Sequence, residues 1–589
     1  MRHFIYPAIA TLVVTGLLAS CASQPSTSTD NAQSTDTNGL STSAVSPWPH
    51  GGMVSVANPY AAEAAAEILR RGGHAVDAAI AAHTVLGLVE PQSSGIGGGA
   101  FMLVFDRATK TLTAYNGREK APLSATADLF KAPDGNTIGF RDAWQGGLST
   151  GVPGSVALYK LAHEEHGTLP WASGFEAAIE LANEGFEVSP RLAGFLPRIA
   201  AFGRLDEHPE AMAYFYPDGK PLTEGSVRDN PDYAQTLTAI AANGPAAFYT
   251  GSIAEAMVAA TSSDPLPGTL SLEDLANYKA SRGDAVCYTS KGNRLCTVAP
   301  PSSGLAAISM VALYDLLVPP KPTETQRLQA LVDAQRLAYA DRDHYIGDPQ
   351  FGPIPSADLL NSTYLASRAD ERFAPSATPT PGDPGAVLRN QPLIGQYAAD
   401  RPTEASSTTH LSIIDNNGNA VALTASVEAP FGNSRLVNGF LLNNQLTDFR
   451  RDADGLAHAN APAAGKQPRS SMSPLMTFDA QGNLELVTGS PGGNSIIAYV
   501  AKSVIASLRW DLSDSDAVAL PNVVARGAKV RVETANDDGK AMAASLRELG
   551  YDVQEREGEN SGLHQIRVTS QGLTGAADPR REGKVIPVP

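Results

Sequence analysis

The chain has 589 residues, of which 43% are hydrophobic and 18% charged, and its formal net charge at pH 7 is −17. This composition is ordinary for a globular protein and supplies enough apolar side chains for a substantial core. Because the acidic excess repels phosphate backbones and no cluster of Lys and Arg interrupts it, the sequence disfavours nucleic acid as a partner.

The first residues have the pattern of an export signal: Arg2, an apolar stretch from Phe4 to Leu18, and small residues up to Cys21. About 15 apolar residues are fewer than the roughly 20 that span a bilayer, which disfavours a membrane-spanning helix. The surroundings of Cys21 resemble the lipobox of bacterial lipoproteins. We therefore expect residues 1–20 to be a lipoprotein signal peptide and Cys21 to anchor an exported, periplasmic or cell-envelope protein. The alternative is an ordinary signal peptide with a coincidental cysteine.

Residues 21–47 consist almost entirely of Ser, Thr, Asp, Asn, Gln, Ala and Gly. Because so little apolar surface does not offset the entropy cost of folding, we predict a disordered tether that holds the folded body away from the membrane. The remaining length suggests about two to four domains. We find no second linker of this kind and no repeat, so one large body fits equally well. The Pro-, Gly- and Ala-rich run 373–387 is the best interior candidate for a flexible connection.

Apolar residues at helical spacing predict two helices within 59–89, separated at Arg71-Gly72-Gly73. The following loop, Gly95–Ala100, superficially matches a dinucleotide-binding fingerprint. That motif must open a helix, whereas here a strand, Phe101–Phe105, follows, so we do not expect nucleotide binding. A second strand is predicted at Leu112–Tyr115. Further helical patterns cover 153–166, 174–184, 232–243, 252–260, 303–317 and 324–344.

Two other local motifs do not fit the chemistry that they suggest. Gly147–Gly151 matches the nucleophile-elbow pattern but lacks the buried strand that must precede it, so we predict a loop. His163 and His166 are three residues apart, whereas a zinc-protease helix places its histidines four apart. We interpret this segment as an exposed helix face and predict no metal site.

Cys287 and Cys296 lie in two short β-prone runs that flank Lys291-Gly292-Asn293. Facing cysteines near the ends of paired strands can approach to bridging distance, and an exported compartment permits their oxidation. We predict a hairpin closed by one disulfide; the alternative is a pair of free buried thiols.

In the C-terminal part of the chain, Asn416-Asn417-Gly418 predicts a tight turn between strands His410–Ile414 and Ala420–Ser426. Two further strands are predicted at Leu484–Thr488 and His564–Val568. Helices and antiparallel strands are thus mixed, which favours an α/β layer architecture.

Directly before the first of these strands stands the hydroxyl-rich run 406–410, Ser-Ser-Thr-Thr-His. Such a run is common at loop ends and indicates nothing alone. Together with other segments, however, it resembles in order the γ-glutamyltransferase family of N-terminal nucleophile hydrolases. The matching segments span nearly the whole exported body: 51–54, 72–79, 91–99, 117–122, 300–304, 339–342, 408–410, 443–445, 469–474, 488–493 and 578–580. The resemblance implies a four-layer αββα sandwich, built from a large and a small fragment of one precursor.

The resemblance also implies that the precursor cuts itself between Ser407 and Thr408. The hydroxyl of Thr408 attacks the preceding carbonyl, and water releases the resulting ester. A large fragment, 48–407, and a small fragment, 408–589, then remain associated as a heterodimer. The freed α-amine of Thr408, with an ordinary pKa of about 7.7 to 8.0, serves as the base for the same residue's hydroxyl.

Other site residues follow from the same match. Gly492 and Gly493 match the oxyanion-hole glycines, and Ser426 replaces a threonine whose hydroxyl orients the nucleophile. Recognition of the substrate's α-carboxylate is expected from Arg118 with Ser470 and Ser471, and recognition of its α-ammonium from Gln445 and Asp448.

The chain departs from the family pattern at two places near this site. Glu428 stands where asparagine is common and helps to hold the α-amine, and glutamate offers a charged acceptor there. The connection 449–469 is shorter than in relatives that have a lid over the site, so we expect an open pocket.

The resemblance therefore implies a γ-glutamyl hydrolase and transferase that needs no cofactor. Glutathione is the default donor, and the acceptor is water, an amino acid or a peptide. Two alternatives stay open. One is a related acylase for glutaryl or cephalosporin-type side chains, which lack the α-amine, and the other is a non-catalytic lipoprotein that retains the fold.

Overall fold

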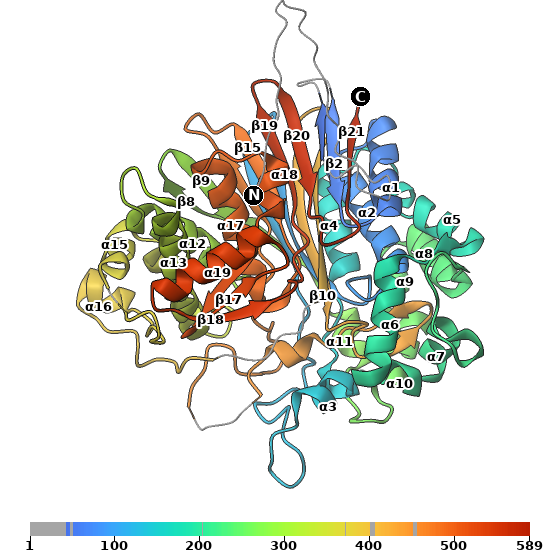
Figure 1. Ribbon diagram of the computed structural model, residues 1–589. Helices are drawn as coiled ribbons and strands as arrows, with labels where there is room; N and C mark the ends of the chain where they lie inside the picture. Colours follow the sequence, from blue (N-terminus) through green and yellow to red (C-terminus); the bar gives the residue numbers. More distant parts are fainter. Residues whose placement is uncertain (1–42, 47–50, 203, 372, 401–406, 452–455) are drawn as a thin grey trace, which may run out of the picture. The chain divides into compact units, whose positions relative to one another are not determined.

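The computed structural model describes residues 43–46, 51–202, 204–371, 373–400, 407–451 and 456–589 (Figure 1). The signal peptide, Cys21 and all of the tether except 43–46 lie outside these residues. The described residues all belong to one compact unit, Gln33–Pro589. None of their helices is long and apolar enough to span a bilayer.

Two seven-stranded sheets, with all neighbouring strands antiparallel, form the centre of this unit. The first sheet has the order β1 (Ser43–Ser46), β20 (Gly572–Ala577), β19 (His564–Thr569), β15 (Leu484–Gly489), β14 (Leu475–Phe478), β9 (Asn293–Thr297), β8 (Val286–Ser290). The second has the order β21 (Lys584–Val588), β2 (Gly52–Val56), β10 (Ser407–Ile414), β11 (Ala420–Glu428), β3 (Gly99–Asp106), β4 (Thr111–Gly117), β7 (Ser281–Asp284).

Strand β3 illustrates how the second sheet is buried on both faces. Its residues Phe101, Leu103 and Phe105 share one core cluster with Leu486 and Ile566 of the first sheet. The alternating residues Ala100, Met102 and Val104 belong to the other large cluster, which they share with the helices on the outer face. In the sequence, a strand that is apolar on both faces therefore appears as a continuous run of hydrophobic residues.

Helices cover the outer face of each sheet (Figure 1). Over the second sheet lie α1 (Pro59–Arg70), α2 (Ala75–Val89) and α4 (Ser155–His166). Over the first lie α12 (Gly304–Leu317), α17 (Ile496–Arg509) and α18 (Asp514–Ala519), and α13 (Glu324–Tyr345) packs on α12. The predicted four-layer αββα arrangement is confirmed.

The remaining elements lie around these layers. They are α3 (Phe140–Gln145), α5 (Glu176–Glu184), α6 (Pro190–Phe202), α7 (Pro209–Phe215), α8 (Pro231–Asn243), α9 (Ala246–Tyr249), α10 (Ser252–Thr261), α11 (Leu272–Ala276), α14 (Ser356–Leu359), α15 (Ser362–Asp370), α16 (Pro384–Arg389) and α19 (Asp537–Glu548). The small sheets are β5 (Phe186–Glu187) with β6 (Val227–Arg228), β12 (Leu436–Val437) with β13 (Phe440–Leu441), and β16 (Val523–Arg526), β17 (Lys529–Glu533) and β18 (Asp552–Arg556).

The predicted break between the first two helices is present and has a local cause. Asn58 caps α1 through its side chain, and Gly72 adopts a φ of 79° just after the helix ends at Arg70. His74 and Asp77 then form a reciprocal cap at the start of α2. The cysteine hairpin is also present, and a disulfide joins Cys287 on β8 to Cys296 on β9.

One sequence-based expectation is wrong, and a second holds only in part. The run 373–387 is not a flexible connection, because long side chains from α13 and α15 hold its carbonyls: Arg336 donates to Ala374 over 2.9 Å and Arg368 to Thr380 over 3.0 Å. In the segment 163–166, Glu164 and Glu165 are exposed, but His163 and His166 are half-buried. His163 Nε2 contacts the carbonyl of Leu169 at 3.0 Å, and His166 Nε2 contacts the hydroxyl of Tyr115 at 2.7 Å.

Candidate active site

Thr408 is the second residue of β10, and its side chain is buried. The pairing of β10 with β11 is irregular here, because Ser407 pairs with Glu428 while Thr409 pairs with Ala425. Strand β11 therefore contains one extra residue, a β-bulge. The bulge bends β11 beside Thr408, and it places Ser426 opposite that threonine.

The hydroxyl of Ser426 connects the two groups that would react in self-cleavage. Thr408 Oγ1 donates to Ser426 Oγ over 3.3 Å, and Ser426 Oγ donates to the carbonyl oxygen of Ser407 over 2.6 Å. The backbone N–H of Glu428 donates to the same hydroxyl over 2.8 Å. With one donated and two accepted bonds, the hydroxyl of Ser426 uses its full capacity.

Glu428 has an unusual backbone conformation for a residue with a side chain, with a φ of 79°. Its carboxylate accepts a 2.5 Å hydrogen bond from the side-chain amide of Asn444. Strained residues of this kind persist only where their surroundings fix them, and they cluster at functional sites. Here the bulge and Asn444 together hold the Glu428 side chain at the site.

A small cavity of about 20 Å³ lies beside Thr408. This volume holds roughly one water molecule. Eight of its ten lining residues are ones that the sequence predicted: Thr408, Ser426, Glu428, Gln445, Asp448, Ser470, Ser471 and Gly493. The other two, Met472 and Ile496, were not predicted, and they supply its apolar wall. Residues from distant parts of the chain thus converge on the threonine as expected.

Gln445 and Asp448 begin and end one turn of 3₁₀-helix, Gln445–Asp448, in which residues three apart lie on the same side. The amide of Gln445 donates to Asp448 Oδ2 over 2.7 Å. Arg118 Nη2 donates to the same oxygen over 2.6 Å. This turn therefore presents side-chain oxygens of Gln445 and Asp448 as acceptors, and the buried guanidinium of Arg118 fixes the Asp448 carboxylate.

Arg118 does not line the cavity. Its guanidinium is completely buried, and besides Asp448 it donates to the carbonyls of Pro468 at 3.1 Å and Arg469 at 2.8 Å. Its Nη1 lies 3.4 Å from Glu119, whose pKa burial raises to about 7. In this uncut chain Arg118 reaches the site through Asp448, so its role toward a carboxylate stays a prediction.

Ser470 and Ser471 form the opposite wall of the cavity, and sequence reasoning missed the residue that positions the second of them. Arg342, on α13, donates from Nη2 to Ser471 Oγ over 2.7 Å and from Nε to Ser303 Oγ over 3.0 Å. Its Nη1 lies 3.4 Å from the side-chain oxygen of Asn494. Arg342 therefore links the serine wall to the glycine loop. The only signal in the sequence was its place in the segment 339–342.

The glycine loop leads from β15 into α17. Gly492 has a φ of 135° and Gly493 a φ of 56°, and a Cβ on Gly492 would lie 2.5 Å from a ring carbon of Tyr499. A side chain is therefore excluded at Gly492 by both conformation and space. Gly493 lines the cavity, whereas Gly492 lies next to it in the chain. Their part in an oxyanion hole stays a prediction.

His410, two residues after Thr408, is a structural residue. It is completely buried, with Nδ1 2.8 Å from Thr424 Oγ1 and Nε2 3.1 Å from Ser412 Oγ. Burial, followed by the nearby His564, lowers the pKa of His410 well below its usual value. The ring is neutral and bonded on both nitrogens, so it does not serve as a base for the threonine.

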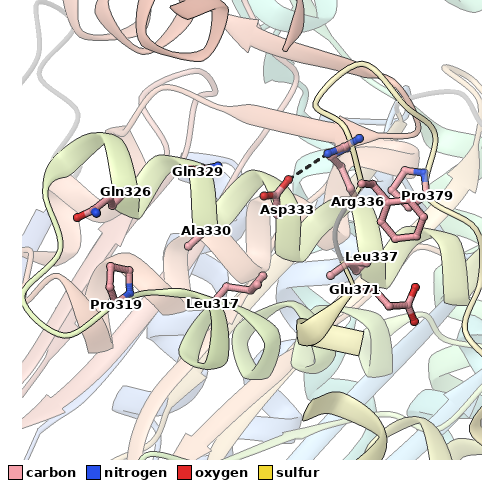
Figure 2. Close-up of a pocket in the computed structure, with 11 residues that line it drawn as sticks. Leu317, Pro319, Gln326, Gln329, Ala330, Asp333, Arg336, Leu337, Glu371 and Pro379 are labelled. Carbon is pink, nitrogen blue, oxygen red and sulfur yellow. Dashed lines mark hydrogen bonds and ion pairs between the residues drawn. The ribbon is translucent and has the colours of Figure 1, made fainter. Parts of the chain in front are cut away.

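A roomier pocket of about 270 Å³ lies elsewhere, along α13 (Figure 2). None of the predicted site residues lines it. Figure 2 shows Arg336 turned toward Asp333, to which it donates over 3.0 Å. This guanidinium also holds the carbonyl of Ala374, so its charge stabilises the fold at this pocket. Among the described residues no group of His, Cys, Asp and Glu is arranged to hold a metal ion.

Comparisons with known proteins point to one family. The family model Gamma-glutamyltranspeptidase matches residues 61–588. The chain is 34% identical over 544 residues to the Glutathione hydrolase proenzyme of Escherichia coli (strain K12), covering 90% of each protein. It is 31% identical over 547 residues to the protein of the same name from Bacillus subtilis (strain 168), covering 91% of each.

The fold is similar to that of solved structures. A cephalosporin acylase from Bacillus halodurans superposes with a TM-score of 0.80 at 25% identity, covering 96% of this chain and 98% of the acylase chain. A γ-glutamyltranspeptidase chain from Helicobacter pylori superposes with a TM-score of 0.50 at 30% identity, covering 58% of this chain and 95% of that one.

Proposed function

The chain belongs to the γ-glutamyltranspeptidase family, and we propose that it is a self-cleaving γ-glutamyl hydrolase and transferase whose nucleophile is Thr408. One observation carries this proposal. The hydroxyl of Ser426 bonds both to the hydroxyl of Thr408 and to the carbonyl oxygen of Ser407. This arrangement prepares the Ser407–Thr408 peptide for attack by the threonine.

In the self-cleavage, Thr408 Oγ bonds to the carbonyl carbon of Ser407 while the peptide C–N bond breaks. The proton of the hydroxyl passes to the nitrogen, which leaves an ester and a free amine. Ser426 donates to the carbonyl oxygen as negative charge develops on it. Water then hydrolyses the ester, which gives a large fragment ending at Ser407 and a small fragment beginning at Thr408. The relatives' designation as proenzymes supports this sequence of events.

In the mature enzyme the free α-amine of Thr408 takes the proton of its own hydroxyl. The hydroxyl oxygen attacks the γ-amide of the donor and forms a γ-glutamyl ester, and the amine then protonates the leaving group. The backbone N–H groups of Gly492 and Gly493 stabilise the alkoxide. Water or the amino group of an amino acid or peptide then attacks the ester and restores Thr408.

We assign the substrate's amino-acid head group to the two polar walls. The α-ammonium lies against Gln445, Asp448 and Glu428, and the α-carboxylate against Ser470 and Ser471, while Arg118 lies behind Asp448. The carboxylate of Asp448 lines the cavity, and the buried guanidinium of Arg118 lies 2.6 Å from it. An α-ammonium finds opposite charges in Asp448 and Glu428, while the hydroxyls of Ser470 and Ser471 can donate to the α-carboxylate. Glutathione is the donor that the relatives' names suggest.

A second candidate function is an acylase for glutaryl or cephalosporin-type side chains. The observation that favours it is the similarity of nearly the whole chain to a cephalosporin acylase. Such substrates lack an α-ammonium, so they bring no donor to the acceptors Gln445, Asp448 and Glu428 that line the cavity. A γ-glutamyl head group would place its cation beside the carboxylates of Asp448 and Glu428, which favours the γ-glutamyl function.

We further propose that the protein is an exported lipoprotein anchored at Cys21, with the large and small fragments as a heterodimer. The intact masses of the purified protein test the anchor and the cut together. We expect an acylated fragment beginning at Cys21 and ending at Ser407, and a second fragment 408–589. An uncut wild-type chain would refute the enzyme proposal.

A pair of substrates separates the two enzyme functions. A γ-glutamyl anilide and a glutaryl anilide differ only in the α-amine. We expect turnover of the γ-glutamyl compound and little of the glutaryl one, and the reverse preference would favour the acylase. Thr408→Ala is the control, and it should leave one uncut, inactive chain.

A further inference from the structure

A cluster of buried polar side chains adjoins the Ser407–Thr408 peptide. We call Glu90, Gln92, Ser93, Arg191, Arg581 and Glu582 the junction cluster. Two bonds tie it to the peptide: Ser407 Oγ donates to the backbone carbonyl of Gln92, and Arg581 Nη1 donates to the carbonyl oxygen of Thr408 over 2.9 Å. The cluster thus contacts both residues that flank the scissile bond.

Several polar atoms of the junction cluster have no hydrogen-bond partner among the described residues. They are both carboxylate oxygens of Glu90, both side-chain amide atoms of Gln92, the hydroxyl of Ser93, Nε and Nη2 of Arg191, and Oε2 of Glu582. The side chains of Glu90, Gln92 and Ser93 are completely buried. A buried polar group without a partner costs about 1–3 kcal/mol, and native proteins satisfy such groups with ordered water. Eight such atoms in one cluster indicate an internal water site.

Among the described residues the charged side chains of the cluster form no ion pair with one another within 4.0 Å, although the backbone N–H of Arg191 donates to Glu582 Oε1 over 2.6 Å. Arg581 also donates to the carbonyls of Ser561 at 3.2 Å and Asn560 at 3.0 Å, so its guanidinium is fixed. Glu90 forms no ion pair within 4.0 Å in the described part of the chain, although Arg191 and Arg581 both act on its charge. A carboxylate, an amide and two cations in one buried cluster are groups to which a buried water can bond.

These groups face Glu90 from every element around it. Arg191 comes from α6, Arg581 and Glu582 from the segment before β21, and Ser93 from the loop after α2. Burial raises the pKa of Glu90, whereas Arg191 and Arg581 lower it and Glu582 raises it. Burial also lowers the pKa of Arg581 to about 9. The Glu90 carboxyl therefore keeps its proton to a higher pH than an exposed glutamate does.

We propose that the junction cluster serves the self-cleavage: Arg581 positions Thr408 through its carbonyl, and Glu90 takes a proton from the water that hydrolyses the ester. This inference rests on the proposed self-cleavage at Thr408. The water oxygen bonds to the carbonyl carbon of Ser407, and the bond from that carbon to Thr408 Oγ breaks. Glu90 accepts one water proton and passes it, through the water site, to the departing Thr408 oxygen. Neither residue takes part in later turnover of donor substrates.

The test follows the cleavage of freshly synthesised precursor by intact mass in a series of buffers from acidic to alkaline pH. Wild-type cleavage should rise with pH, because Glu90 must be ionised to accept a proton. Glu90→Gln should slow cleavage on the order of 10²-fold, the size of a general-base contribution, and should abolish the rise. Glu485→Gln is the matched control, since burial raises the pKa of Glu485 as well and that residue bonds to Asn293 on the first sheet.

Glu90→Asp and Arg581→Lys complete the test. Glu90→Asp keeps a carboxyl and should cleave faster than Glu90→Gln, with the rise with pH retained. Arg581→Lys keeps the positive charge but loses the planar guanidinium that donates to three carbonyls at once, and it should slow cleavage at all pH values. If Glu90→Gln fails to fold, Glu90→Asp decides: slowed cleavage with the rise retained supports the inference, and the wild-type rate overturns it.

The role of the junction cluster can be refuted without refuting the proposed function. A wild-type chain that never cuts refutes both. A wild-type chain that cuts, beside a Glu90→Gln chain that cuts as fast and with the same pH dependence, refutes only the role of the junction cluster. Turnover per cut molecule that falls as far as the cleavage rate would also overturn it, because the residue would then act on the site as a whole.

Discussion

Ser426→Ala tests the arrangement on which the proposed function depends. The substitution removes a hydroxyl that donates to the Ser407 carbonyl over 2.6 Å and accepts from Thr408 at 3.3 Å and from the Glu428 N–H at 2.8 Å. A donor aimed at a developing oxyanion contributes about 2.7–4 kcal/mol to the barrier. We therefore expect self-cleavage to slow by about 10²- to 10³-fold.

The same substitution leaves the buried N–H of Glu428 without an acceptor, at a cost of about 1–3 kcal/mol in the free energy of unfolding. The loss of stability must be separated from the loss of rate. Ser412→Ala is the matched control, because Ser412 is a buried serine on β10 that donates to the carbonyl of His564 over 2.9 Å, away from the scissile peptide. It should lower stability similarly and leave the cleavage rate near that of the wild type.

The assay is the fraction of cut chain over time, by intact mass, together with thermal unfolding of each precursor. Ser426→Thr keeps a hydroxyl and should recover most of the rate. A Ser426→Ala chain that cuts within a few-fold of the wild-type rate would refute the reasoning, since the Ser407 carbonyl would then need no donor from this side chain.

Three further predictions concern the mature site and its charges. Arg342→Lys should raise the KM for a γ-glutamyl anilide about 10- to 100-fold with little change in self-cleavage, because it removes a charge-assisted bond to Ser471 worth about 1.5–3 kcal/mol; an unchanged KM would contradict this. Asp448→Asn should lower kcat/KM for the γ-glutamyl anilide far more than for its glutaryl analogue, and equal losses would contradict the assignment of the α-ammonium. The pKa of the Glu119 carboxyl is about 7 in the folded chain, whereas its ordinary value is 4.5. Between these pH values the folded chain holds a proton that the unfolded chain has released, so the free energy of unfolding falls as pH rises. Glu119→Gln should remove a loss on the order of 3 kcal/mol from urea unfolding curves over that window, and an unchanged pH dependence would contradict the shift.

The secondary structure near the site follows from the sequence because its causes are local. The glycine break at Gly72 and the turn at Gly418 both rest on positive φ angles that glycine accepts. The assembled cavity has no such local cause. Nothing in the spacing of Thr408, Gln445 and Ser470 predicts that they meet, so their convergence was expected only through the resemblance to a known family.

Other features were beyond sequence reasoning because they depend on where long side chains end. The run 373–387 has the composition of a linker, and only the reach of Arg336 and Arg368 from neighbouring helices shows that it is held. Likewise, the position of Arg118 behind Asp448 depends on burial, which no motif encodes. The bulge beside Thr408 is a third case, since it arises from one extra residue in β11.

The strand order gives a reason why an intact Ser407–Thr408 peptide bond helps the chain to fold. Cleavage before Thr408 would assign β21, β10, β11, β20, β19, β15 and β14 to one fragment, and their neighbours β2, β3, β1 and β9 to the other. Separate fragments would have to find each other and interleave in both sheets, whereas one chain does so as an intramolecular process at high effective concentration. In a chain that cuts itself here, the Ser407–Thr408 bond would therefore be needed only during folding. After the cut, a heterodimer separated by denaturant would face a bimolecular refolding problem that the precursor never meets, so denaturation of the mature protein would be practically irreversible.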